Sequence, residues 1–196
     1  MKKNQMFIAF AMIMLLSFVT PLVADAYNHW TNKAKLTGGV YYRTFYTERK
    51  TLDHINYGSL VREAVADWND RVNGSVDVYF TEINSNHSSQ ARFWAGGYGN
   101  TGWNGVALFF TYNDGPISTE DSGPKKNYEY SQLKLNHTYL VNDSVNDIRA
   151  TIKHEFGHAL GLAHSGELHS IMYKNRNRTT RFVQPDDITG VKNLYQ

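Results

Sequence analysis

One segment, residues 154–164, constrains this chain more than any other: it reads His-Glu-Phe-Gly-His-Ala-Leu-Gly-Leu-Ala-His. On an α-helix, positions i and i+4 lie on the same face, so His154 and His158 can bind one metal ion. If the helix continued, His164 would lie about 120° away and about 9 Å further along the axis. The helix must therefore break, and Gly161 allows this because glycine enters the left-handed conformation without a Cβ penalty.

Glu155 and the three histidines have the chemistry of a catalytic metal site. Three neutral imidazoles leave the fourth position of a tetrahedral Zn²⁺ to water, which is typical of catalytic rather than structural zinc. Glu155 lies outside the ligand pair, where its carboxylate can act as general base toward that water. The segment predicts one catalytic zinc ion and hydrolysis of peptide bonds. His-Glu-x-x-His can arise by chance on a helix, but the glycine and third histidine at fixed offsets argue against chance.

The segment resembles the motif of the metzincin metallopeptidases, His-Glu-x-x-His-x-x-Gly-x-x-His followed by a methionine turn. Within that clan the chain is most similar to the matrixin branch, from about residue 144 to 196. Ser165 directly follows the third histidine, Met172 comes eight residues after His164, and residues 184–190 resemble the start of that branch's last helix.

The resemblance implies a fold class and a role for each motif residue. The fold is α+β and metzincin-like: a twisted mixed β-sheet, two long helices above the active-site cleft, and a small C-terminal subdomain ending in a helix. The implied roles are zinc binding for His154, His158 and His164, catalysis for Glu155, a structural floor beneath the metal for Met172, and the helix break for Gly161.

Residues 1–26 have the three parts of a secretory signal: two lysines near the start, an apolar run over 6–18, and Ala-Asp-Ala at 24–26. We expect cleavage there, which leaves 27–196 as one metallopeptidase domain that is secreted and extracellular. The alternative is an uncleaved anchor, giving a membrane-tethered form of the same peptidase. The apolar run is short of the roughly 20 residues that span a bilayer.

Composition limits the partners of such a domain. The formal net charge is only +2, which gives no basis for electrostatic capture of nucleic acid or of a membrane surface. There is no cysteine, so disulfides cannot stabilise an exported domain, and packing and metal ions must do so. The lack of a cysteine that blocks the metal is a departure from many matrixins. We expect protein or peptide substrates, no stable membrane association after signal cleavage, and a monomer.

Hydrophobic periodicity predicts the scaffold around the motif. The predicted strands are 40–47, 76–81, 105–111, 128–135 and 139–141. The first predicted helix is capped by Ser59, buries Trp68, and runs through Val72 to a stop at Asn73-Gly74. The catalytic helix is capped by Asn146 or Asp147. A final helix is predicted over 186–195. Ile148, Ile152, Phe156 and Ala159 form an apolar stripe on the catalytic helix. Residues 84–104, rich in Asn, Ser and Gly, are expected to form a long loop.

The sequence contains candidate residues for two further metal sites. Asp114, Glu120 and Asp121 lie in the separator 112–127 and can supply oxygen ligands to calcium, so calcium is possible. They lack the spacing of an EF-hand, and a solvated turn is the alternative. A second, structural zinc, which matrixins bind through several histidines, is not expected because only His87 is available in the corresponding stretch.

The segment after Met172 is basic, with Lys174, Arg176, Arg178 and Arg181. In matrixins this region walls the pocket for the residue that follows the scissile bond. A preference for acidic or polar groups there is one reading, and a solvated loop is the other.

A non-enzymatic function is the main alternative to catalysis. In that reading zinc only stabilises a binding module, and the aromatic residues of 93–103 contact a partner. The intact Glu155 favours the enzyme.

Overall fold

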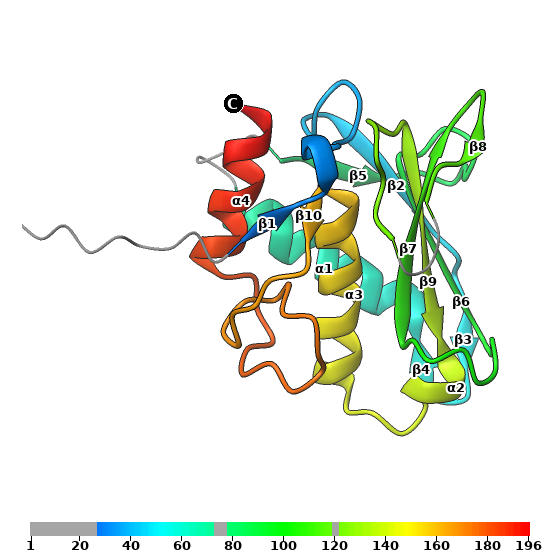
Figure 1. The fold of residues 1–196 in the computed structure, drawn as a ribbon. Coiled ribbons are helices and arrows are strands. Elements are labelled where there is room, and N and C mark those ends of the chain that lie inside the picture. The colour runs from blue at the N-terminus through cyan, green and yellow to red at the C-terminus, as the bar shows by residue number, and fades with distance from the viewer. Residues whose placement is uncertain (1–26, 73–77, 119–121) are drawn as a thin grey trace, which may run out of the picture.

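The computed structural model describes residues 27–72, 78–118 and 122–196, and it is built on a six-stranded mixed β-sheet (Figure 1). The strands are β2 (Arg43–Thr47), β5 (Phe80–Glu82), β6 (Ala91–Gly96), β7 (Gly105–Thr111), β8 (Gly115–Pro116) and β9 (Tyr130–Asn136). Their spatial order is β5-β2-β6-β9-β7-β8. The first four in this order run parallel, and β7 and β8 are antiparallel to their neighbours. The mixed sheet confirms the predicted α+β class.

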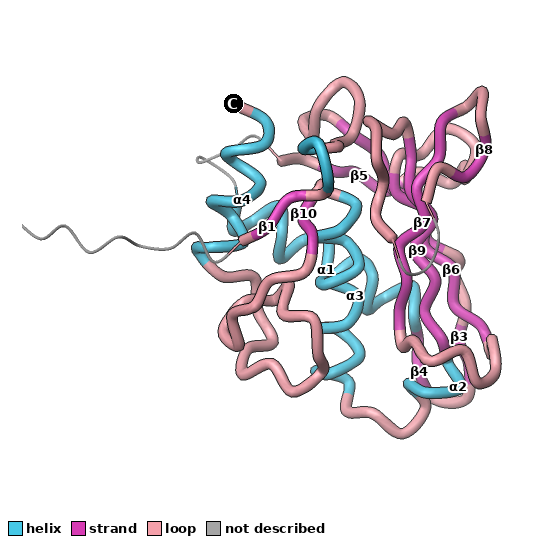
Figure 2. Tube along the Cα trace, viewed as in Figure 1, coloured by secondary structure: helices cyan, strands magenta, loops and turns pink. Residues whose placement is uncertain are grey.

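Two long helices, α1 (Tyr57–Val72) and α3 (Val145–Ala159), pack together and cover one face of this sheet (Figure 2). Trp68 joins them, because its buried indole donates a hydrogen bond to the Lys153 carbonyl at 3.0 Å. The ring of Phe156 contacts aromatic rings of β5 and β6, which docks α3 on the sheet. The whole predicted stripe of α3 is buried: Ile148, Ile152, Phe156 and Ala159. Burying each large apolar side chain contributes about 1.5–3 kcal/mol.

The remaining elements are short, apart from the last helix. They are β1 (Asn28–His29), the 3₁₀ helix η1 (Thr31–Lys33), β3 (Thr51–Leu52), β4 (Ile55–Asn56), α2 (His137–Leu140), β10 (Leu162–Ala163) and α4 (Pro185–Tyr195). β10 pairs with β1, and α4 packs against both (Figure 1). This is the expected C-terminal subdomain ending in a helix. No helix in the described ranges has the length and apolar character needed to cross a bilayer.

The predicted long loop over 84–104 is wrong, because β6 lies within it and forms the middle of the sheet. β6 pairs with β2 on one side and with β9 on the other. A strand that is hydrogen-bonded on both edges and largely buried does not need strict polar alternation, and the Asn, Ser and Gly residues around it gave the segment the composition of a loop. Phe93 is buried in this strand, so it is not available to a partner as the binding-module hypothesis required.

The predicted strand over 139–141 is also wrong, because α2 occupies this position. The side chain of Asn136 caps α2 by accepting the Thr138 N–H at 3.2 Å. A side-chain cap of this kind satisfies a backbone donor that a strand would leave for a neighbour. Four residues are too few to show helical periodicity in the sequence.

Two helix starts differ from their predicted caps. α1 begins two residues before Ser59, because Asn56 Oδ1 accepts the Ser59 N–H at 3.0 Å. α3 begins at Val145, because Ser144 is its N-cap and accepts the Asp147 N–H at 3.1 Å. In both cases a nearby Asn, Ser or Asp competes for the same role, and the sequence does not rank them.

Other boundaries agree closely with the sequence. β7 has the predicted limits, β9 and α4 differ by one or two residues, and β2 begins three residues later than predicted. The signal segment 1–26, the helix stop at 73–74, the start of the strand at 76–77, and Glu120 and Asp121 lie outside the described residues.

Candidate metal centre

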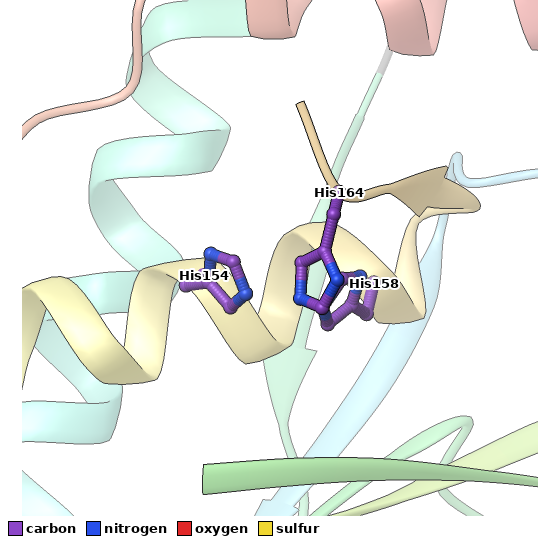
Figure 3. Close-up of side chains that lie close together, drawn as sticks. All are labelled: His154, His158 and His164. Atoms are coloured by element: carbon purple, nitrogen blue, oxygen red, sulfur yellow. The ribbon is translucent and has the colours of Figure 1, made fainter. Parts of the chain in front are cut away.

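The side chains of His154, His158 and His164 converge (Figure 3). One ring nitrogen of each lies within 4.8 Å of those of the other two. The ring centroids are 4.6, 4.8 and 5.1 Å apart, and Nε2 of His158 is 3.3 Å from Nε2 of His164. These separations suit three nitrogens that each lie about 2.0–2.1 Å from one ion. Within the described ranges this is the one cluster of three or more His, Cys, Asp or Glu side chains placed to hold a metal.

The break in α3 brings the third histidine to the first two. The helix ends at Ala159, and Gly161 has φ of 100°, which L side chains rarely adopt. The chain then turns into β10, and His164 follows (Figure 3). Asn28 of β1 fixes this point by donating from Nδ2 to the His164 carbonyl at 2.8 Å.

Backbone carbonyls set the tautomers of the two helical histidines. Nδ1 of His154 lies 2.8 Å from the Ile171 carbonyl, and Nδ1 of His158 lies 2.8 Å from the Leu162 carbonyl. A carbonyl only accepts, so each Nδ1 carries the proton and donates it. Each Nε2 then keeps its lone pair for a metal, which is how ligating histidines are usually oriented.

Electrostatics keep these rings neutral. Burial, helped by the neighbouring His164, lowers the pKa of His158 to about 3. Burial and the adjacent His158 lower the pKa of His154 well below its usual value, and burial also lowers that of His164. Because metal ligands must be unprotonated, these rings can bind a cation near neutral pH without first losing a proton.

Glu155 is buried next to the histidines, and burial raises the pKa of its carboxyl to about 8, with the charge of Arg178 opposing the rise. A pKa near neutrality suits a group that takes and returns a proton. Gly105 of β7 leaves room for it, because a Cβ there would lie 2.6 Å from Glu155 Cγ and 2.7 Å from Oε1. Two cavities, of about 110 and 340 Å³, meet here, and both are lined by Gly105, Val106, Glu155 and His164.

Met172 packs against the turn of α3 that carries the ligands. It is buried, and a Cβ on Gly157 would collide with its sulfur. Its carbonyl accepts the Ser165 N–H at 2.8 Å, which ties the loop after the third histidine to the methionine. Met172 therefore lies directly against the helix turn at Gly157, and its role as a floor beneath a metal stays a prediction.

Asp187 supports the same region from α4. Its carboxylate is inaccessible to solvent and accepts from Ser170 Oγ at 2.5 Å, from the Ile171 N–H at 3.1 Å and from the Gln184 N–H at 2.8 Å. The Ile171 carbonyl is in turn the acceptor for His154. The carboxylate thus helps to position Ile171, the residue whose carbonyl holds the His154 ring, a role that sequence reasoning missed although it noted the surrounding motif.

Two other contacts at the site, and the burial of one residue of the basic segment, were not foreseen. The ring of Trp30 lies 5.0 Å from that of His158, Gly105 admits Glu155, and Arg178 is buried. Nothing local in the sequence signals these contacts, since each joins segments far apart in the chain. The calcium expectation finds no support: Asp114 forms an ion pair with Lys126 at 2.5 Å.

The chain folds as a mixed sheet covered by two helices, and three imidazoles converge beside a buried glutamate. These features define the class of metal-binding proteins whose ligands lie on a His-Glu-x-x-His helix. The sequence matches the matrixin (Peptidase M10) family over residues 19–196, and the chain belongs to this family. The recognition made from the motif is thereby confirmed.

Particular relatives can also be named. The chain is 45 % identical over 51 residues to metalloendoproteinase 1 of Glycine max, covering 25 % of this chain and 17 % of that protein. It is 26 % identical over 148 residues to metalloendoproteinase 1-MMP of Arabidopsis thaliana, covering 70 % and 37 %. The matched part therefore spans well under half of each relative.

A solved structure shares the architecture. The structure described as the GM1 bound form of the ECX AB5 holotoxin superposes with a TM-score of 0.58 over 88 % of this chain and 89 % of that one. The sequence identity is 17 %, so this similarity shows the fold alone.

Proposed function

We propose that this chain is a zinc-dependent metalloendopeptidase that hydrolyses peptide bonds of protein substrates. The observation that carries the proposal is the convergence of three neutral imidazoles beside the carboxylate of Glu155. An all-nitrogen set of three is the donor chemistry that zinc accepts in catalytic sites. The two plant relatives, both named as metalloendoproteinases, add support.

His154, His158 and His164 would hold the zinc. When bound, zinc polarises the carbonyl of the scissile bond and makes water more acidic. Glu155 takes the proton of the attacking water and passes it to the leaving amine. The bonds from Nδ1 of His154 and His158 to backbone carbonyls keep both rings oriented during this exchange.

We further propose that the domain is 27–196 and is secreted after removal of the signal 1–26. The signal pattern in the sequence supports this, and the near-neutral charge gives no other reason for membrane attachment. Edman sequencing of the exported protein tests the proposal. A first residue of Tyr27 is expected, whereas an intact start at Met1 would favour the membrane-tethered form.

Metal removal tests the catalytic proposal. Purified protein is expected to contain one zinc per chain, to cleave casein, and to lose this activity on dialysis against 1,10-phenanthroline. Adding stoichiometric zinc should restore cleavage, because the neutral imidazoles are held in place by the fold. Calcium added alone serves as the control. Undiminished cleavage by protein shown to be metal-free would refute the proposal.

A further inference from the structure

The larger cavity beside the metal centre has a wall rich in positive charge. Its lining joins His154, Glu155 and His164 to residues of the segment 174–178. Three cationic side chains come from that segment: Lys174, Arg176 and Arg178. Among the described residues that line it, Glu155 is the single acid. At about 340 Å³ the cavity has room for a substrate side chain.

Only part of this positive charge is balanced within the protein. Arg176 forms an ion pair with Asp143, and Arg181, which lies outside the lining, pairs with Asp147. Within the described ranges no carboxylate lies at ion-pair distance from Lys174 or Arg178. The cavity therefore presents two cations that have no carboxylate in ion-pair contact among the described residues, although Glu155 lies close enough to Arg178 to affect its charge.

Arg178 differs from its neighbours because it is only 7 % exposed. Its Nη1 donates to the Ile171 carbonyl at 3.3 Å and lies 3.2 Å from His154 Nδ1. Its Nε and Nη2 have no hydrogen-bond partner among the described residues, and neither is among the polar atoms sealed from solvent. Burial lowers the pKa of this guanidinium to about 10, which leaves it charged at neutral pH.

The open edge of Arg178, Nε with Nη2, has the geometry that binds a carboxylate through two parallel hydrogen bonds. A largely buried guanidinium is less well hydrated than an exposed one, so an arriving carboxylate gains more here than it would at an exposed arginine. Given the peptidase function proposed above, on which this step rests, we infer that the cavity is a specificity pocket for an acidic side chain adjacent to the scissile bond, bound by Arg178 with support from Lys174.

A pair of matched peptides tests this inference. A degenerate peptide library first locates the position with the strongest preference, and two peptides are then made that differ only by Glu or Gln there. The zinc-loaded enzyme is expected to show a kcat/KM about 10- to 100-fold higher for Glu, the range of one charge-assisted interaction. In Arg178→Gln, with zinc content measured in parallel, the Glu/Gln ratio should fall to near one.

Two other variants keep the test decisive if Arg178→Gln folds poorly. Lys174→Gln changes an exposed cation of the same lining and should lower the Glu/Gln ratio severalfold. Arg49→Gln removes an equal charge from a side chain that is 69 % exposed and outside the lining, and it should leave the ratio unchanged. A wild-type preference for an apolar or neutral side chain would overturn the inference.

Binding separates this inference from the proposed function. The Glu and Gln peptides are titrated by fluorescence anisotropy into zinc-loaded Glu155→Gln, with and without Arg178→Gln. The Glu peptide can bind more tightly than the Gln peptide, in a way that depends on Arg178, while the wild-type enzyme cleaves neither. That result would support the acidic pocket and refute the proposed peptidase function. The wild-type enzyme can instead cleave the peptides with no preference for Glu in either assay. That result would support the proposed peptidase function and refute the acidic pocket.

Discussion

Replacing Glu155 with alanine is expected to lower kcat/KM for peptide hydrolysis by about 10²- to 10⁴-fold, the range that general acid–base catalysis supplies. The buried carboxylate is the only acid among the described residues that line both cavities at the metal centre. The change removes the group that exchanges a proton with water, but it removes none of the three imidazoles. Zinc content, measured by plasma mass spectrometry, should therefore stay at one per chain.

Two further variants serve as controls for this measurement. Glu167→Ala removes an exposed glutamate near the third histidine and should retain wild-type activity. His158→Ala removes an imidazole and should lose both zinc and activity. The general-base assignment fails if Glu155→Ala cleaves casein at the wild-type rate while holding its zinc.

Replacing Asp187 with alanine is expected to lower the free energy of unfolding by about 3 to 5 kcal/mol. Its carboxylate is the acceptor for Ser170 Oγ and for the backbone N–H groups of Ile171 and Gln184. Losing it leaves these buried donors unpaired and opens a cavity beneath the methionine segment. Because Ile171 also holds His154, zinc affinity should fall as well.

Urea unfolding of the zinc-loaded and zinc-free forms measures both effects. Asp187→Asn keeps the volume and one acceptor oxygen, so its loss of stability should be smaller than that of the alanine variant. The supporting role of Asp187 would be refuted by an alanine variant with the wild-type urea midpoint and an unchanged zinc dissociation constant.

The features that sequence could predict are those encoded over a few neighbouring residues. The ligand spacing in α3, its apolar stripe and the glycine break are all local, and the structure places each one close to its predicted position. Prediction from local sequence pattern fails where pairing with distant strands determines the secondary structure. β6 is a strand because β2 and β9 bond to both its edges, although the residues around it have the composition of a loop.

Arg178 shows the same limit at the site. In the sequence it is one of several cations after Met172, and a solvated loop fits them all equally well. Lys174 and Arg176 are indeed exposed, whereas Arg178 is buried against Ile171 and beside His154. Which member of a basic run turns inward depends on how the segment folds back over α3, and no spacing rule in the sequence specifies this.

The position of β10 has a consequence for biogenesis. This strand, which delivers the third imidazole, lies between β1, from the beginning of the domain, and α4, from its end. Gly190 of α4 makes close contact with Leu162, and the His29 ring hydrogen-bonds to the Gly190 carbonyl at 2.7 Å. The pairing of β1 with β10 needs no residue beyond 163, whereas the support from α4 requires residues 185–195. We therefore expect the three imidazoles to reach their final arrangement only after α4 has docked on β1 and β10.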